Sequence, residues 1–145
     1  MKERGVCFDP TVATLEVGTR SPNSVLGERF RAMQPRGREV AARAVKAGVR
    51  IIAGTDMTSD RPTPTVADEL MELVAAGMTP LQAIRAATSV AAQCLGVEEH
   101  VGTIKPGLAA DLVAVARDPL EDIAALQNLA LVVHDGTIVL NRLGP

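Results

Sequence analysis

An acidic residue at the end of a buried strand is the feature of this chain best suited to chemistry. Residues 49–54 are apolar apart from Arg50, and the run leads into Gly54-Thr55-Asp56. Folds of the α/β class place their reactive groups at such strand ends. A hydrolytic metal site needs several His or carboxylate ligands, but both histidines of this chain lie far downstream. The sequence therefore predicts part of an enzyme, with a turn or helix-capping aspartate as the alternative for Asp56.

The polar residues around Asp56 and the two histidines have less direct interpretations. Thr55 is expected to orient Asp56 rather than to act as a nucleophile, because no base lies nearby in the sequence. Arg61 is either a solvated loop residue or a bidentate contact for a substrate carboxylate. His100 follows a helix end and is expected at the surface, and His134 lies at a hairpin turn and is expected to be structural. Neither histidine replaces the missing ligands.

Composition excludes several classes of partner. The chain has 145 residues, 47% of them hydrophobic, which is enough for one domain with a core. Its 15 Lys and Arg are scattered among 17 Asp and Glu, giving a formal net charge of -2. Without a basic stripe, neither nucleic acid nor an anionic membrane surface is an expected partner. Phe8 and Phe30 are the only aromatic residues, so stacking platforms for bases or sugars are absent from the sequence.

The two cysteines indicate a reducing compartment. Cys7 and Cys94 are isolated and have no CxxC spacing. We expect both to be reduced and buried, with a disulfide as the minor alternative. The sequence has no run long enough to span a bilayer and does not begin with a secretory segment, so a cytoplasmic location is expected.

The first half of the chain predicts a strand-helix-strand unit. A short strand at residues 5–9 is followed by a loop at 16–23, a weak helix at 24–33 and a stronger helix at 38–47 that ends at Gly48. The next strand, at residues 49–54, is apolar on both faces apart from Arg50, as in a strand covered by helices or lining a barrel.

The second half predicts three capped helical segments and then a change to β structure. Thr65 and Thr79 are expected to cap helices with Asp68 and Gln82, and a short helix at 89–95 follows. Beyond Gly102 we expect a strand at 110–116, a short helix at 118–126, and strands at 129–133 and 138–140 joined by a two-residue turn at Asp135-Gly136.

A series of motifs follows in a fixed order along the chain: Gly54-Thr55-Asp56, Gly77-Met78-Thr79-Pro80-Leu81-Gln82-Ala83, Ala86-Ala87-Thr88 with Ala91-Ala92, Gly102-Thr103-Ile104-Lys105-Pro106-Gly107, and Ala110-Asp111-Leu112-Val113. In this order and spacing the series resembles the C-terminal part of the amidohydrolase superfamily. Two further motifs, Asp118-Pro119-Leu120 and Val132-Val133-His134-Asp135-Gly136, also fit its imidazolonepropionase-like and prolidase-like branch.

The resemblance implies an α/β fold made of an incomplete (β/α)8 TIM barrel followed by part of a small β-sandwich. Residues 1–100 would be the C-terminal part of the hydrolase barrel, containing its last two strand-helix units, and residues 101–145 part of the composite sandwich domain. A whole barrel takes about 250 residues, so the earlier units would have to come from elsewhere.

The resemblance also implies a divalent metal, most often zinc, with Asp56 as both metal ligand and catalytic residue. Asp56 would take a proton from water attacking an amide or lactam carbonyl. The family's other ligands map to strands not found in this sequence, so the chain alone is expected to be inactive. Cyclic amides, aminoacyl-prolines and N-acyl amino acids all remain open as substrates.

An alternative is a non-catalytic association module. A two-strand parallel piece would leave sheet edges and an apolar face uncovered. Another chain, or a second copy of this one, is therefore an expected partner. Self-association would cover the open edges without adding the missing ligands.

Overall fold

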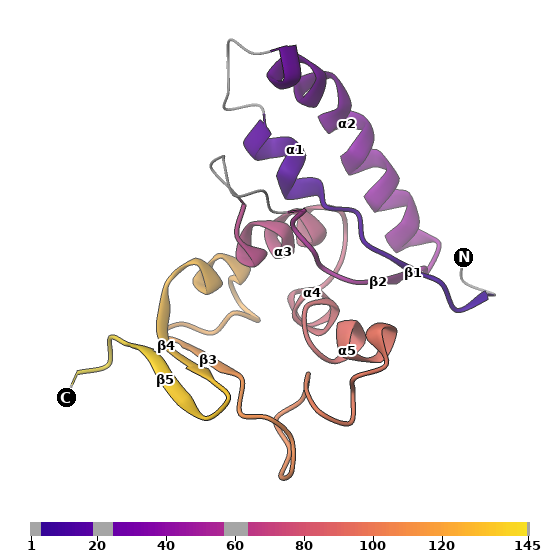
Figure 1. Ribbon diagram of the computed structural model, residues 1–145. Coiled ribbons are helices and arrows are strands. Elements are labelled where there is room, and N and C mark those ends of the chain that lie inside the picture. Colours follow the sequence, from indigo (N-terminus) through magenta and orange to yellow (C-terminus); the bar gives the residue numbers. More distant parts are fainter. Residues whose placement is uncertain (1–3, 19–24, 57–63, 145) are drawn as a thin grey trace.

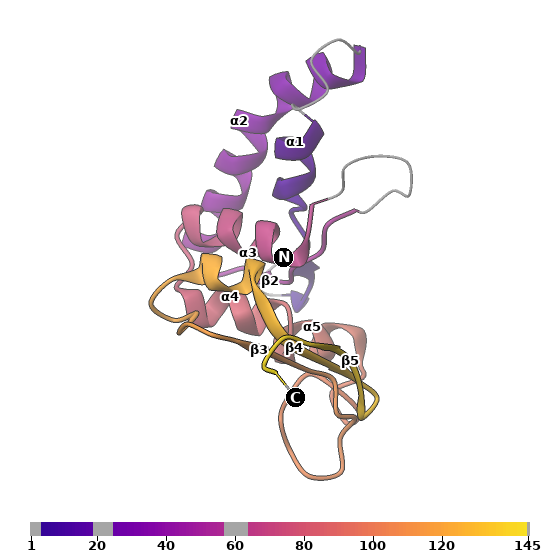
Figure 2. The same cartoon turned by 90° about the vertical axis from the view of Figure 1, so that its left-hand side faces the viewer.

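The first strands and helices form a parallel βαβ unit. The computed structural model describes residues 4–18, 25–56 and 64–144. Strand β1 (Cys7–Phe8) pairs in parallel with β2 (Arg50–Ile51), in the register Cys7 with Arg50 and Phe8 with Ile51. Helices α1 (Val12–Gly18) and α2 (Val25–Lys46) connect the two strands and lie side by side in both views (Figures 1 and 2). The predicted strand-helix-strand unit is therefore confirmed.

The connection between the two strands differs from the prediction in two ways. The predicted loop at 16–23 is wrong at its start, because α1 continues to Gly18, and residues 19–24 lie outside the described part. The two predicted helices are one helix, α2, which runs through Pro35. A proline inside a helix removes a backbone hydrogen bond. Tertiary packing offsets that loss, since α1 packs so closely on α2 that a Cβ at Gly37 would overlap Leu15.

Three short helices follow β2, and the sequence predicted their ends well. In α3 (Val66–Ala75) and α4 (Pro80–Ala86), the capping boxes of Thr65 with Asp68 and of Thr79 with Gln82 are both present. Helix α5 (Ser89–Leu95) ends at Gly96, which takes the left-handed conformation that glycine adopts without strain.

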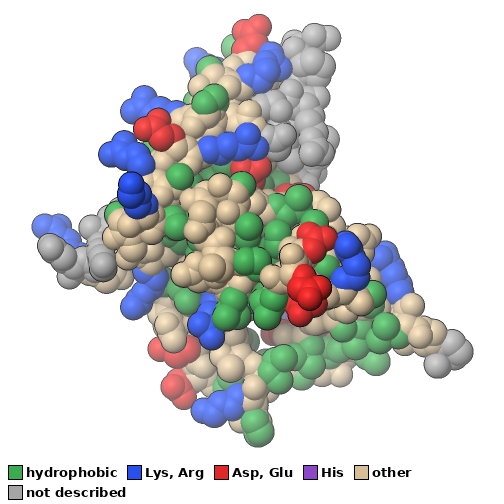
Figure 3. Space-filling model, turned by 180° about the vertical axis from the view of Figure 1, so that it is seen from behind, with side chains coloured by type: hydrophobic (Ala, Val, Ile, Leu, Met, Phe, Trp, Pro, Cys, Tyr) green, Lys and Arg blue, Asp and Glu red, His purple; other side chains and the backbone are tan. Residues whose placement is uncertain are grey.

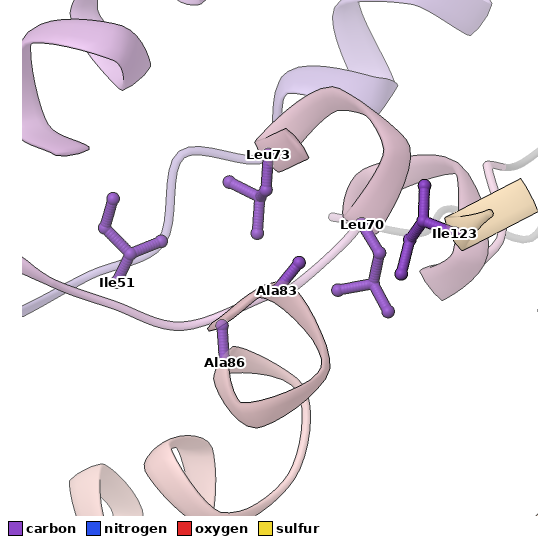
Figure 4. Packing of buried hydrophobic residues seen from close by; sticks show 6 residues of the cluster. All are labelled: Ile51, Leu70, Leu73, Ala83, Ala86 and Ile123. Atoms are coloured by element: carbon purple, nitrogen blue, oxygen red, sulfur yellow. The ribbon is translucent and has the colours of Figure 1, made fainter. Parts of the chain in front are cut away.

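The hydrophobic core lies between these helices and β2. Its buried side chains point toward one another in Figure 4: Ile51, Leu70, Leu73, Ala83, Ala86 and Ile123. Ile51 comes from β2 and Ile123 from the 3-10 helix η2 (Ile123–Gln127), so the core joins the βαβ unit to the C-terminal segment.

The C-terminal segment is a three-stranded antiparallel sheet with β4 in the middle. Its strands are β3 (Leu112–Val115), β4 (Leu129–His134) and β5 (Thr137–Asn141), in the order β3-β4-β5. Asp135 and Gly136 both have positive φ, 48° and 74°, as the predicted primed turn requires.

The predicted helix at 118–126 is only partly helical. The Asp118 carboxylate instead closes a turn by accepting from the Leu120 N–H at 2.8 Å. Asp122 then begins the 3-10 helix by accepting from the Ala124 N–H at 3.0 Å. Each acidic side chain thus takes a backbone N–H two residues ahead, which favours a turn over a regular helix at the start of this segment.

Cys7 and Cys94 form a disulfide that joins β1 to α5, with Cα atoms 6.3 Å apart. The prediction of two reduced thiols was therefore wrong, and the cysteines no longer support a reducing compartment. Their 87-residue separation hid the contact from any local pattern. Within the described ranges, no helix is both long and apolar enough to cross a bilayer.

Reducing this disulfide should destabilise the chain. It closes a loop over a sequence separation of 87 residues, and chain-entropy reasoning gives a loss of about 4.6 kcal/mol on opening such a loop. Urea unfolding with and without reductant measures the loss. The double variant Cys7→Ser/Cys94→Ser is the control and should be insensitive to reductant. Two titratable thiols in the folded, unreduced chain would contradict the bond.

Candidate active site at the ends of the parallel strands

Two acidic residues and one hydroxyl residue, Asp9, Asp56 and Thr55, follow the carboxyl ends of β1 and β2. Because the two strands are parallel, both ends lie at the same edge of the pair. Asp9 directly follows β1, and Gly54-Thr55-Asp56 follows β2. An α/β arrangement of this kind places groups from successive loops close enough to act together.

Asp9 holds the end of β2 through its carboxylate. Its Oδ1 accepts from the backbone N–H of Gly54 at 3.0 Å. A Cβ built on Gly54 would overlap the Asp9 carboxylate. The glycine is therefore required by close approach of the two strand ends.

Asp56 is held through the main chain that precedes it. The hydroxyl of Thr14, on α1, donates to the carbonyl oxygen of Thr55. On the other side, the Ala53 N–H donates to the Ala86 carbonyl at the end of α4, at 3.1 Å. Asp56 itself is exposed and has φ 48°, a left-handed conformation that Asp tolerates better than most residues.

Behind the strand ends lies a buried carboxyl group, that of Glu69 on α3. Its side chain is 0% exposed, and Oε2 accepts from the Ala13 N–H at 2.7 Å. Burial raises the pKa of Glu69 to about 7, although the N–H groups of Ala13 and Val12 lower it; Asp9 and Glu72 raise it further. Among the residues that the structure describes, Oε1 has no hydrogen-bond partner.

The neighbouring acid, Glu72, is paired instead. Arg38 of α2 donates to both of its carboxylate oxygens, Nε to Oε2 at 2.8 Å and Nη2 to Oε1 at 2.7 Å. Bidentate pairing of this kind fixes orientation as well as charge. It ties α2 to α3 beside the buried Glu69.

The remaining predicted residues are distributed over other parts of the fold. Thr55 directly precedes Asp56 in the chain, while Arg61 falls outside the described residues. His134 is at the end of β4, where its Nδ1 lies 2.9 Å from Asp111 Oδ1. The pKa of Asp111 is held below its usual value mainly by the hydrogen bond from the backbone N–H of Asp135, and next by the hydrogen bond to the His134 side chain. That pairing fixes the hairpin.

The residues present do not make up a metal site by themselves. Over residues 4–18, 25–56 and 64–144, no group of three or more His, Cys, Asp or Glu side chains is arranged to hold a metal ion. Asp56 has the chemistry of one ligand, but a single carboxylate does not hold a divalent ion tightly. Further ligands would have to come from outside the described residues.

Sequence reasoning missed three residues of this site: Asp9, Thr14 and Glu69. Asp9 carried a signal similar to that of Asp56, because it is the last residue of the strand predicted at residues 5–9. Glu69 is next to Leu70 and four residues before Leu73, which places it within the apolar face of α3. A charged residue in such a face could have been singled out. Nothing local marked Thr14.

Comparison with known proteins identifies the fold family. Residues 1–139 match the model of the amidohydrolase family. Ochratoxinase from Aspergillus niger is 33% identical over 139 residues, which cover 92% of this chain and 28% of that protein. Imidazolonepropionase from Geobacillus kaustophilus is 41% identical over 76 residues, 50% of this chain and 18% of that protein.

A solved structure agrees with this assignment. The crystal structure of a Xaa-Pro dipeptidase with bound methionine superimposes with a TM-score of 0.82 at 30% identity, covering 94% of this chain and 35% of that one. The mixed α/β fold of this chain thus agrees with its match to the family model. The chain belongs to the amidohydrolase family, and it spans 28% of the length of the ochratoxinase it matches.

Glu69 should make stability fall as the pH rises from about 4.5 to about 7. In that window the carboxyl group is protonated in the folded chain but ionised in the unfolded chain, so folding takes up a proton. The stabilisation is complete below the lower value, and about 3 kcal/mol is lost by the upper one. Glu69→Gln keeps an acceptor for the Ala13 N–H and should remove this contribution. Urea unfolding of both proteins across the window tests it; identical pH dependence would refute the assignment.

Gly54→Ala should destabilise the chain through the Asp9 carboxylate. The added Cβ forces Asp9 away from the Gly54 N–H, at a cost of about 1–3 kcal/mol. In an Asp9→Ala background the same substitution should cost much less, because the clash is gone. A double-mutant cycle from denaturant unfolding measures the coupling. Additive costs would mean that the two strand ends do not meet through this contact.

Proposed function

We propose that this chain supplies the C-terminal part of a metal-dependent amidohydrolase that hydrolyses a C–N bond of an amide, lactam or peptide-like substrate. One observation carries the proposal: Asp56 follows a parallel strand within a chain that matches the amidohydrolase family over residues 1–139. Ochratoxinase, imidazolonepropionase and a Xaa-Pro dipeptidase are among its relatives and structural neighbours.

In this proposal the chain divides at about the end of α5. Residues 1–100 form the last two strand-helix units of a (β/α)8 barrel, and residues 101–145 form part of a β-sandwich. The parallel pairing of β1 with β2 supports the first assignment, and the antiparallel β3-β4-β5 sheet supports the second. The first six units would belong to the remainder of the family fold, since the chain covers 35% of the Xaa-Pro dipeptidase.

Asp56 is the catalytic residue in this proposal and one ligand of a divalent metal, with zinc as the first candidate. Its carboxylate can take a proton from the attacking water and pass it to the leaving nitrogen. Thr55 fixes the main chain next to it by accepting from Thr14. Arg61 is the proposed contact for a substrate carboxylate. The other metal ligands come from the remainder of the fold.

The remainder of the fold is also the proposed partner of the exposed apolar side chains. Val113, Ile138 and Val139 of the C-terminal sheet are each more than half exposed, at 58%, 59% and 60%. Figure 3 shows hydrophobic side chains gathered over this lower part of the molecule, whereas charged side chains, mostly Lys and Arg, stand out over its upper part. An apolar face of this kind normally contacts another protein surface. A second copy of the chain could cover it but would add no new type of ligand.

A chimera tests this function directly. The matching C-terminal segment of Aspergillus niger ochratoxinase is replaced by this chain, to which it is 33% identical. We expect the chimera to hydrolyse the substrate of that enzyme. Asp56→Asn in the chimera should lower kcat/KM by at least about 100-fold, the range lost with a general base. Steady-state hydrolysis, with metal content from elemental analysis, gives the readout.

The matched control is Glu39→Gln, an exposed acid on α2 away from the strand ends. It should leave hydrolysis unchanged, within a factor of about two. A folded chimera whose activity is the same with Asp56→Asn contradicts the catalytic role. If the 145-residue chain alone binds stoichiometric zinc, and still does so with Asp56→Ala, the proposal that Asp56 is this chain's ligand and that the others come from the remainder of the fold is contradicted.

A further inference from the structure

Glu69 is the buried charged group whose position packing does not explain. Its side chain is 0% exposed, yet Oε2 accepts from the Ala13 N–H of another helix and the Val12 N–H also stabilises the ionised carboxyl group. Among the described residues, Oε1 has no hydrogen-bond partner. An apolar residue would fill the same space without the desolvation cost of a carboxyl group. A buried acid at such a cost indicates that a buried N–H group nearby requires a hydrogen-bond acceptor at this position.

The constraint concerns the turn between β1 and α1. Thr11, just before the helix, has φ 45°, and β-branched residues rarely adopt the left-handed conformation. Val12 and Ala13 follow, each 1% exposed, so water does not reach the first N–H groups of α1. Oε2 of Glu69 accepts from the Ala13 N–H at 2.7 Å and therefore fixes where this helix begins.

The start of α1 is in turn bonded to the end of β2. Thr14, the residue after Ala13, donates its hydroxyl to the carbonyl oxygen of Thr55. Asp56 is the next residue, and it too has a positive φ. A continuous path thus runs from Glu69 through the first turn of α1 to the peptide bond that precedes Asp56.

We propose that Glu69 is a positioning residue for Asp56, acting through the Ala13 N–H and the Thr14 hydroxyl. This inference rests on the proposed role of Asp56 in catalysis. Glu69 does not touch the reacting atoms. It orients the first turn of α1, and that turn orients the backbone on which Asp56 is carried.

Three charged residues surround this path and define what an experiment must separate. Asp9 lies on the β1 side and Glu72 on α3, and both raise the pKa of Glu69. Arg38 of α2 is bonded to Glu72. With a pKa of about 7, Glu69 changes its protonation state near neutral pH, where the change can be followed in the folded chain.

Amide resonances of the 15N-labelled chain, followed across neutral pH, test the path. In the unmodified chain, the amides of Ala13, Thr55 and Asp56 should shift together with a common midpoint near pH 7. Glu69→Gln should abolish all three transitions. Thr14→Val should keep the transition at Ala13 but remove it at Thr55 and Asp56, and Thr14→Ser, which keeps the hydroxyl, should restore it.

The matched control is Glu72→Gln, which neutralises the neighbouring acid of the same helix. The three amides should still shift together in this variant, although their midpoint moves. In the unmodified chain, a transition at Ala13 without one at Thr55 and Asp56 overturns the proposal. A transition at all three amides in Thr14→Val overturns it as well. The titration of the unmodified chain decides the question even where a variant does not fold.

The outcome is separable from that of the proposed function. If the amides of Thr55 and Asp56 in the unmodified chain do not shift with that of Ala13, Glu69 does not position Asp56, whether or not Asp56 is catalytic. Undiminished hydrolysis in the Asp56→Asn chimera says that Asp56 is not catalytic, whether or not Glu69 positions it.

Discussion

The pairing of β1 with β2 is the constraint on which the candidate site depends, and it is short. Only two residue pairs form the ladder, Cys7 with Arg50 and Phe8 with Ile51. A two-stranded ladder of this length is not stable by itself in water. Its neighbours hold it in place: the core packs against Ile51, and the Ala53 N–H bonds the end of α4. The strand ends are therefore as well fixed as the helices around them.

Helix α3 contacts the elements around the strand pair and connects them: α1, α2, α4 and η2. Successive helical residues point about 100° apart, so one short helix can contact elements on every side. Its apolar residues enter the core, and three of its acids each reach a different element: Asp68 bonds Gln127 of η2, Glu69 bonds Ala13 of α1, and Glu72 bonds Arg38 of α2. The C-terminal segment, the α1–α2 pair and the strand ends are thus held by a single helix.

The sequence predicted best those features whose partners lie within a few residues. The capping boxes at Thr65 and Thr79 and the turn at Asp135-Gly136 are local patterns, and all three are present. Continuation of α2 through Pro35 depends on packing against α1, which no window around the proline reveals. The same holds for the site. The sequence predicted the strand before Asp56, but the role of Glu69 depends on its hydrogen bond to Ala13, which is 56 residues away in the chain.

The way Asp56 is held leaves its side chain available. The contacts around it use backbone groups: Asp9 bonds the N–H of Gly54, and Thr14 bonds the carbonyl of Thr55. The carboxylate of Asp56 is exposed as a result. A ligand or base must present its lone pairs to something outside its own scaffold, and a side chain tied up by hydrogen bonds cannot do so. Asp56 needs a fixed position and a free carboxylate, and holding only its main chain meets both requirements. The supporting acids therefore bond backbone N–H groups elsewhere and leave the Asp56 side chain alone: Asp9 accepts from Gly54, and Glu69 accepts from Ala13.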